Sequence, residues 1–435
     1  METASESTEP FDTDSVALPA FDELELRSPP TARIVEPPLS VRTRVRRQAH
    51  ARVATDLRRE LLWITVIYLA VRGGLLVAAF LQASFSHHAF QTELANWDGL
   101  WYRELANHGY PAHVSYAQTT LGFFPLFPLT MWGVEHVLIL AMHNHLILSA
   151  TVAGVVISGI GGLVATILVH RLAESWWDRD TARRAAILFV LFPGSVVFSM
   201  VYSEGLMLPL AAGCIYALQQ RRWVLAGVLA AFGTAVQPVG LMLTPVCLVS
   251  AMLELRRCGW QLRPALRAFA APVLSVTGLA AFAVFLWAWT GSPLANYIAQ
   301  HHGWSEKTDP LAIWNLTTKL ASEVSLHHFN DPTINLNLIV GMVGVVVLVI
   351  MLVLVYFSRR EISVEALVWT AAISFLAVTS EYVPPNPRML ITAFPALIAV
   401  AHYIRGRWFR MLAWTNGSLL ILLSLLTFYD RILRP

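Results

Sequence analysis

The chain has 435 residues, of which 56% are hydrophobic and only 14% are charged, and its mean hydropathy is +0.56. Because the apolar residues come in long runs, this composition excludes a soluble globular protein and predicts a membrane protein. The net charge of +3 says little about partners, since the location of positive charge matters more than its sum. The three cysteines are an odd number, and Cys214 and Cys247 lie inside apolar runs, so no disulfide framework is indicated.

The first 59 residues contain no membrane segment, and their charge changes sign. Residues 1–40 are rich in Glu, Asp, Ser, Thr and Pro and show little apolar periodicity, which is typical of disorder. From Arg42 to Arg59 the charge is positive, so this run should face the cytoplasm and its anionic leaflet. We therefore expect residues 1–59 to form a disordered cytoplasmic tail, acidic and then basic, without a cleavable signal peptide.

Residues 60–435 are predicted to form a polytopic, all-α transmembrane bundle. A hydrocarbon core about 30 Å thick needs roughly 20 apolar residues of helix. Apolar segments lie at 61–81, 146–170, 183–201, 203–219, 223–254, 268–290, 334–357, 363–380, 389–404 and 411–428. The segment 223–254 has basic residues at both ends, so we expect two short helices that meet near Gln237 and Pro238. This gives about eleven membrane segments.

The arginines sort the connections into two groups. Basic connections, which should be cytoplasmic, lie at 171–184, 221–222, 256–267, 359–360 and 405–410. Residues 83–145, 291–333 and 381–388 hold few basic residues and are expected outside. The apolar stretch Thr120 to His143 cannot cross under this scheme, because the basic loop after it would then lie outside. We expect it to be re-entrant or to lie on the outer surface, interrupted by Pro125 and Pro128.

The polar motifs fall on the outer side of this scheme, at "NWDGLWYRELANHGY" (96–110), "VYSEG" (201–205), "QPVG" (237–240) and "EYVPPNPR" (381–388). A transporter is expected to carry polar groups at mid-membrane and to have paired halves. Arg72, in the first span, is the main exception. An arginine at that depth needs a partner, and we expect an ion pair with an acid on a neighbouring helix rather than a phosphate contact.

Asp98 has two interpretations. It can cap a helix that starts at Gly99, since Asp is a preferred N-cap residue. The flanking Trp97, Trp101 and Tyr102 favour a functional role, because aromatic faces beside a carboxylate suit a sugar, although aromatic side chains also gather at membrane interfaces.

Glu204 is similarly ambiguous. It lies at the lip of a span, where it either simply reaches water or uses the hydroxyls of Tyr202 and Ser203 in a functional site. Arg388 ends an outer loop and is the better phosphate candidate, because a guanidinium makes bidentate bonds to anions. Its alternative role is to anchor the loop at the membrane interface. The paired histidines at 87–88, 301–302 and 327–328 lack the spacing that puts two ligands on one helix face, so we do not expect a metal site there.

Together these motifs resemble the PIG-V-type mannosyltransferases, membrane glycosyltransferases of the GT-C class that use a lipid-linked sugar donor. The resemblance rests on "NWDGLWYRELANHGYP", "FFPLFPL" at 123–129, "FPGSVVFSMVYSEGL" at 192–206, "QPVGL" at 237–241 and "PRMLITAFPAL" at 387–397. It implies a GT-C-like fold with Asp98 as the catalytic residue. The chain departs from the family pattern at Gln237, where relatives commonly carry Arg, and at Met389, where they often carry Tyr.

The resemblance implies an inverting glycosyltransferase, in which a cation meets the phosphate leaving group and a carboxylate acts as general base on the acceptor. The expected catalytic residues are Asp98 and Glu204. The expected substrate-binding residues are Trp97, Trp101, Tyr102, Tyr202, Ser203, Gln237, Gln300, Trp304 and Arg388. No cofactor is required by this scheme, although Glu204 beside Asp98 leaves room for a divalent metal.

The expected partners are a polyprenyl-phosphate sugar donor, a lipid or glycan acceptor and membrane lipids, with no nucleic acid. All but two of the 31 basic residues are arginine, which indicates a GC-rich genome and makes an actinobacterial envelope glycolipid the expected acceptor. The enzyme is expected in the plasma membrane, with its amino terminus in the cytoplasm and its active site outside. The alternatives are a transporter or flippase of a lipid-linked substrate and an inactive relative that scaffolds envelope enzymes.

Overall fold

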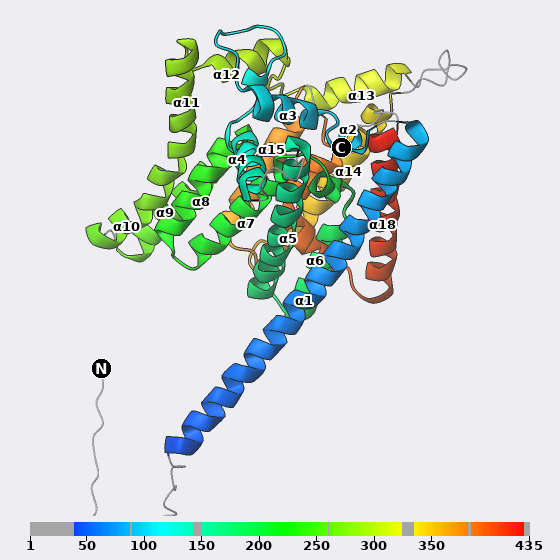
Figure 1. Cartoon of the computed structure of the whole chain (residues 1–435). Coiled ribbons are helices and arrows are strands. Elements are labelled where there is room, and N and C mark those ends of the chain that lie inside the picture. Colours follow the sequence, from blue (N-terminus) through cyan, green and yellow to red (C-terminus); the bar gives the residue numbers. More distant parts are fainter. Residues whose placement is uncertain are drawn as a thin grey trace, which may run out of the picture. The chain divides into compact units, whose positions relative to one another are not determined.

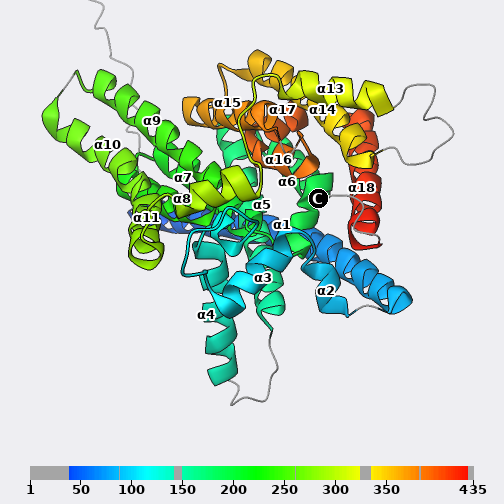
Figure 2. The same ribbon diagram turned by 90° about the horizontal axis from the view of Figure 1, so that it is seen from above.

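The computed structural model describes residues 39–87, 89–141, 149–259, 261–323, 335–381 and 384–429. The chain divides into two units, residues 1–57 and 58–435, and the second unit contains all the apolar segments. Figure 1 labels most of the helices, and α16 and α17 are labelled in Figure 2. The helices are α1 (Leu39–Ser86), α2 (Phe90–Leu94), α3 (Asp98–His108), α4 (Leu126–Ala141), α5 (Ala150–Trp176), α6 (Arg179–Leu191), α7 (Glu204–Gln219), α8 (Trp223–Val236), α9 (Leu243–Arg257), α10 (Leu262–Ser275), α11 (Thr277–Thr290), α12 (Ala295–Ile298), α13 (Ala312–Glu323), α14 (Leu336–Ser358), α15 (Val364–Thr379), α16 (Pro387–Thr392), α17 (Phe394–Tyr403) and α18 (Gly406–Tyr429).

The described residues also contain three 3₁₀ helices, η1 (Thr120–Gly122), η2 (Pro193–Ser199) and η3 (Pro238–Met242), and a π-helix, η4 (Ala299–Gly303). Within the described ranges, strand-like pairing is limited to an isolated bridge between Thr308 and Ser380. The all-α fold expected from the sequence is thus confirmed. The expected disorder of residues 1–59 stays a prediction for residues 1–38, which lie outside the described part, whereas α1 already begins at Leu39.

All eleven apolar segments contain helix, but they differ in length. Among the described residues, six helical stretches are long and apolar enough to cross a membrane: Arg58–Ser86, Ala150–Trp176, Pro238–Arg257, Arg263–Thr290, Leu336–Ser358 and Gly406–Phe428. A seventh is obtained if α6 and η2, bent by 70°, form one span. The apolar helices α8, α15 and α17 have 14, 16 and 10 residues. Because a helix rises about 1.5 Å per residue, these are shorter than a 30 Å core. By length, six or seven of the about eleven expected membrane segments are full spans among the described residues, and the rest are shorter.

The break expected inside segment 223–254 lies where the sequence indicated it. Helix α8 ends at Val236, Gln237 has extended backbone with φ −166° and ψ 163°, and η3 leads into α9. Pro238 begins η3, where its missing N–H leaves no helix hydrogen bond unmade. Gly240 lies so close to α8 that a Cβ there would be 2.0 Å from the Gly233 carbonyl oxygen.

The stretch Thr120 to His143 forms η1 and α4, and its residues 142 and 143 lie outside the described part. Pro125 directly precedes α4 and Pro128 lies in its first turn, which proline tolerates. Helix α4 has 16 residues and packs against α5 and α3. The interruption expected at Pro128 is therefore wrong, because α4 continues through it, whereas Pro125 does lie outside the helix. That the stretch is re-entrant or lies on the outer surface stays a prediction.

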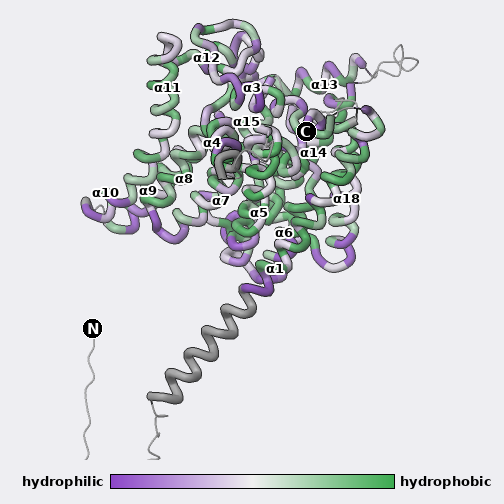
Figure 3. Tube along the Cα trace, in the orientation of Figure 1, coloured by the Kyte–Doolittle hydropathy of each residue, from purple (hydrophilic) through white to green (hydrophobic). Residues whose placement is uncertain are grey.

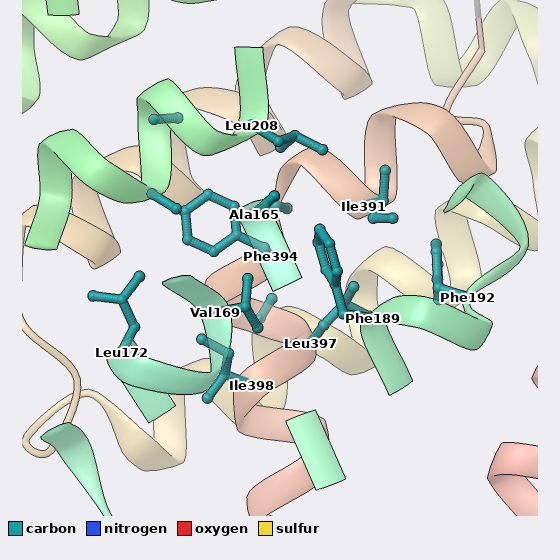
Figure 4. Packing of buried hydrophobic residues seen from close by; sticks show 14 of the residues in the cluster. Ala165, Val169, Leu172, Phe189, Phe192, Leu208, Ile391, Phe394, Leu397 and Ile398 are labelled. Carbon is teal, nitrogen blue, oxygen red and sulfur yellow. The ribbon is translucent and has the colours of Figure 1, made fainter. Parts of the chain in front are cut away.

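The central core is formed by α5, α6, α7, α16 and α17. Figure 4 shows Phe189 of α6 and Phe394 of α17 packed with aliphatic side chains of α5 and α7, and all of these residues are buried. Burying a large apolar side chain contributes about 1.5–3 kcal/mol in water, but between helices in lipid close packing supplies most of the stability. This core holds the ends of α7 and α16, which carry functional side chains.

Arg72 is buried in the first span, and its partner differs from the prediction. Its guanidinium contacts the carbonyl and hydroxyl of Ser195 and donates to the Val190 carbonyl at 2.8 Å. Helix α6 stops at Leu191, so its last carbonyls lack intrahelical partners and the arginine supplies them. The expected ion pair with an acid is wrong: no acidic side chain contacts Arg72 in the part of the chain that the structure describes.

Polar and apolar segments are separated in space. In Figure 3 the segments around α3, α12 and α13 are hydrophilic at the upper side, and the turns between α9 and α10 and before α18 are hydrophilic at the lower side. Apolar helices fill the space between them. Viewed from above, α3 and α4 lie on one side of α5 and α7, and α15 and α16 lie on the other (Figure 2). The helix ends that carry the polar motifs therefore surround a common region.

Candidate active site

A strained turn places Asp98. Trp97 has φ 57° and ψ −120°, a backbone conformation that a residue other than glycine rarely adopts. Such strain persists only where the surroundings hold it, and it is concentrated at functional sites. The turn is held because Gly99 approaches the Val201 carbonyl, from which an added Cβ would be only 3.1 Å away, and Val201 N–H donates to Leu94 at 3.0 Å.

Asp98 does not cap a helix. Helix α3 begins at Asp98 itself, its N-cap residue is Trp97, and no side chain caps it. The Asp98 carboxylate instead accepts from Arg388, which lies 290 residues further along the chain. The capping interpretation is therefore wrong, and the carboxylate is free to serve the site.

Arg388 connects two carboxylates. It lies in the first turn of α16, whose N-cap Asn386 accepts from the Met389 N–H at 2.9 Å. Arg388 pairs with Asp98 and also with Glu204, the first residue of α7: its Nε lies 3.5 Å from Oε1 of Glu204. Its guanidinium also lies over the Tyr202 ring, 5.5 Å from the centroid. Three helices that are distant in sequence thus bring one cation and two acids together.

A cavity of about 560 Å³ surrounds this cluster. All eleven residues predicted from the sequence line it: Trp97, Asp98, Trp101, Tyr102, Tyr202, Ser203, Glu204, Gln237, Gln300, Trp304 and Arg388. The structure therefore brings every candidate to one place. Their roles in binding and catalysis stay predictions.

One wall of the cavity is aromatic. Trp101 stacks on Phe123 with centroids 6.1 Å apart and meets Trp304 edge-on at 5.0 Å. Gly122 gives Trp304 its place, because a Cβ at this glycine would lie 2.6 Å from the indole Nε1. The Gln300 side-chain amide also donates to the Gly122 carbonyl at 2.9 Å, which ties the segment that carries Trp304 to Gly122. Such a wall suits the C–H face of a sugar ring.

A second wall is built from hydroxyl and amide groups. The Tyr102 hydroxyl donates to Ser203 Oγ at 2.7 Å, and Ser203 donates to the Gln237 side-chain oxygen at 2.8 Å. Gln237 therefore helps to order the site as a neutral group. Apolar side chains complete the lining, with Ile373 and Leu376 from α15 beside Val239 of η3.

Glu306 also lines the cavity, and it was not predicted from the sequence. It follows Trp304 by two residues, so the signal was an acid beside an aromatic candidate in the loop 291–333. Glu306 is an exposed residue at the cavity wall, but the protein around its carboxyl group removes part of its water, which raises its pKa. Arg388 opposes this pKa shift, and the negative charge of Asp98 adds to it.

Metal ligands are not clustered in the described residues, where no group of three or more His, Cys, Asp or Glu side chains is placed to hold an ion. The Arg388 guanidinium lies between Asp98 and Glu204. His301 and His302 are in η4, and their rings meet edge-on with centroids 4.9 Å apart. His88, His327 and His328 lie outside the described residues.

The model of the mannosyltransferase (PIG-V) family matches residues 70–317, which is more than half of the chain. The chain belongs to the PIG-V mannosyltransferase family. The match includes Asp98, Glu204, Gln237 and Glu306 of the cavity, while Arg388 lies beyond its end. No curated protein matches the chain.

Solved structures of membrane enzymes are similar at low identity. ArnT from Cupriavidus metallidurans bound to undecaprenyl phosphate has 15% identity and a TM-score of 0.45, with 80% of this chain and 62% of that chain covered. The Archaeoglobus fulgidus oligosaccharyltransferase with zinc and sulfate has 15% identity and a TM-score of 0.48, with 84% and 53% covered. AglB from the same organism, with an inhibitory peptide and dolichol-phosphate, has 12% identity and a TM-score of 0.43, with 84% and 56% covered. The chain thus covers less than two thirds of each of these proteins.

Proposed function

We propose that the protein is an inverting membrane glycosyltransferase that moves a mannosyl group from a polyprenyl-phosphate donor to an envelope glycolipid or glycan acceptor. The observation that carries the proposal is the convergence of Asp98, Glu204 and Arg388 in a cavity with an aromatic wall. Membership of the PIG-V family supports the mannosyl group. The neighbouring structures, whose names include undecaprenyl phosphate and dolichol-phosphate, prompt the choice of donor but do not carry it.

Arg388 is the group that receives the donor phosphate. The phosphate gains charge as the glycosidic bond breaks, and a guanidinium already held in place stabilises that charge without reorganisation. In the structure the partner of Arg388 is the Asp98 carboxylate, which is an oxyanion as the phosphate is. A bound phosphate competes with Asp98 for the guanidinium, and this competition releases the carboxylate for chemistry.

Asp98 then acts as general base. It removes the proton of the acceptor hydroxyl as that oxygen attacks the anomeric carbon from the side opposite the phosphate. One displacement with one base inverts the anomeric configuration. Glu204 holds the other side of Arg388, with its Oε1 at 3.5 Å from Nε, and keeps the cation oriented while Asp98 is free. Donor and acceptor lipids are both confined to one leaflet, which reduces the entropy lost when they meet.

A transporter is not favoured by the described residues. A substrate path would need free polar groups at mid-membrane. The buried Arg72 is engaged by the carbonyls and hydroxyl at the end of α6. Arg72 therefore does not offer its charge to a substrate path at that depth.

We expect Asp98→Asn to abolish transfer but to keep donor binding. Loss of a general base lowers the rate by about 10²–10⁴-fold. The measurement is transfer of radiolabelled mannose from polyprenyl phosphomannose to membrane lipids by purified protein in liposomes. Asp180→Asn is the matched control, because that side chain is 79% exposed in α6 and lies outside the cavity. Undiminished transfer by Asp98→Asn would remove Asp98 from the mechanism.

A further inference from the structure

The charges on the cavity walls do not balance. Four charged side chains line the cavity: Asp98, Glu204, Glu306 and Arg388. Three carboxylates thus face one guanidinium, and the formal charge is −2 when all are ionised. A phosphodiester donor adds another negative charge to this space. Charges brought together in surroundings of low dielectric repel strongly, so donor binding needs a compensating event.

Among the described residues, Glu306 is the cavity carboxylate that has no cation beside it. Asp98 and Glu204 both pair with Arg388. Among the residues that the structure describes, no basic side chain forms an ion pair with Glu306. Its backbone N–H donates to the Gln300 carbonyl at 3.0 Å. Because Glu306 is exposed, water rather than a cation meets its charge in the free protein, and a bound donor would displace some of that water.

The backbone prevents Glu306 from leaving the cavity wall easily. Ser305 has a left-handed backbone with φ 53°, which turns the chain just before Glu306. On the other side, the Lys307 carbonyl accepts from Glu381 at 3.1 Å, and Thr308 pairs with Ser380. The Asp309 N–H donates to Thr379 at 2.7 Å. These bonds tie the segment to the end of α15 and keep the backbone of Glu306 at the cavity wall.

We propose that Glu306 binds the donor phosphate as a neutral carboxylic acid: on donor binding it takes up one proton from solvent and donates it in a hydrogen bond to a phosphate oxygen. This inference rests on the proposed function, because it requires a phosphate-linked donor. No bond other than O–H is made or broken. Proton uptake removes one negative charge and supplies a hydrogen-bond donor beside Arg388.

The surroundings favour this event at Glu306. Removal of water and the negative charge of Asp98 raise its pKa, although Arg388 opposes them. A phosphate nearby raises that pKa further. The titratable groups that line the cavity with Glu306 are Asp98, Tyr102, Tyr202, Glu204 and Arg388. His301, His302 and Lys307 lie near Glu306 in sequence but are not part of the cavity lining.

The sign of the pH dependence follows from linkage. Because the pKa of Glu306 is higher in the complex than in the free protein, donor affinity is greatest at low pH. Donor affinity falls as the pH rises from the pKa of Glu306 in the free protein to its pKa in the complex, by up to about tenfold per pH unit. The phosphodiester itself does not titrate in this range, so it is a suitable probe.

Isothermal titration calorimetry tests this with polyprenyl phosphomannose, without acceptor and with a chelator present. We expect wild-type heats to depend on the ionisation enthalpy of the buffer, showing uptake of up to one proton, and affinity to fall with rising pH. Glu306→Gln, a neutral mimic, should bind with an affinity that no longer changes with pH and without proton uptake. Glu104→Gln, outside the cavity, is the matched control and should behave as wild type.

The outcomes separate the role of Glu306 from the proposed function. Wild-type binding without pH dependence, or proton uptake that persists in Glu306→Gln, would overturn the role of Glu306 alone. Binding that appears only when a divalent cation is added, without proton uptake, would also overturn it. If Glu306→Gln is unstable, wild-type binding without buffer dependence still overturns the proposal, and Glu306→Ala replaces Glu306→Gln as the variant that must lose proton uptake. Absence of donor binding at every pH would count against the donor class and therefore against both proposals.

Discussion

At the scale of single residues, the cavity depends on pairings between distant parts of the chain. Asp98 and Arg388 are separated by 290 residues and meet in an ion pair. Their motifs indicated a common side and one function, but nothing in either motif specifies the contact. Trp97 shows the same limit, because its φ of 57° is imposed by packing against residues near 201 rather than by its own preference.

Gln237 offers a test of charge at the residue scale. Replacing it with arginine, the residue common in relatives, loses the hydrogen bond from Ser203 and adds a cation to a cavity with excess negative charge. We expect Gln237→Arg to tighten binding of polyprenyl phosphate by about tenfold, equivalent to about 1.4 kcal/mol. Titration calorimetry measures this. Gln261→Arg, in the exposed turn before α10, should leave affinity unchanged, and weaker binding by Gln237→Arg would contradict the expected role of charge.

At the scale of elements, apolar periodicity and proline positions predicted much of the structure. The break at Gln237 and Pro238 was indicated by local sequence. The interruption expected at Pro128 is absent, because proline is tolerated in the first turn of α4. The partner of Arg72 was not, because it consists of carbonyls exposed by the early end of α6, a feature that depends on how that helix packs. Glu306 was missed for a related reason, since pairing with the distant Ser380 region places its loop on the cavity wall.

The contact between η1 and the loop after η4 predicts a specific effect. In Gly122→Ala the new Cβ would lie 2.6 Å from Trp304 Nε1, so the indole must move from the aromatic wall. We expect KM for the donor to rise by up to about 100-fold, since small displacements of positioning groups have effects of this size. Gly133→Ala in α4 is the control, because nothing lies within 4 Å of its added Cβ. An unchanged KM for Gly122→Ala would show that Trp304 does not position substrate.

At the scale of the whole molecule, the helical class was predictable from the sequence, but the length of each helix was not. Mean hydropathy identifies an apolar segment without showing where packing ends it. Helix α17, for example, has 10 residues inside an expected segment of 389–404, because α16 and a turn at Ala393 take up the rest. Short helices of this kind reach only part of a bilayer and leave room for a cavity at their ends.

Membrane orientation is also testable at this scale. The arginine distribution predicts that Glu104→Cys and His302→Cys react with a membrane-impermeant maleimide in intact cells. Arg222→Cys and Arg359→Cys should react only after the cells are permeabilised. Cys258 is partly exposed and is therefore replaced by Ser in every variant. Cys214 and Cys247 are buried and can stay. The reverse labelling pattern would place the cavity on the cytoplasmic side and contradict the proposed topology.

The most direct measurement is an experimental structure of the protein with polyprenyl phosphomannose bound. We expect the phosphate within hydrogen-bond distance of Arg388, the mannose ring against Trp101, and the Asp98 carboxylate facing the anomeric carbon from the side opposite the phosphate. A donor bound with its phosphate away from Arg388 and its sugar outside the cavity would contradict the central claim.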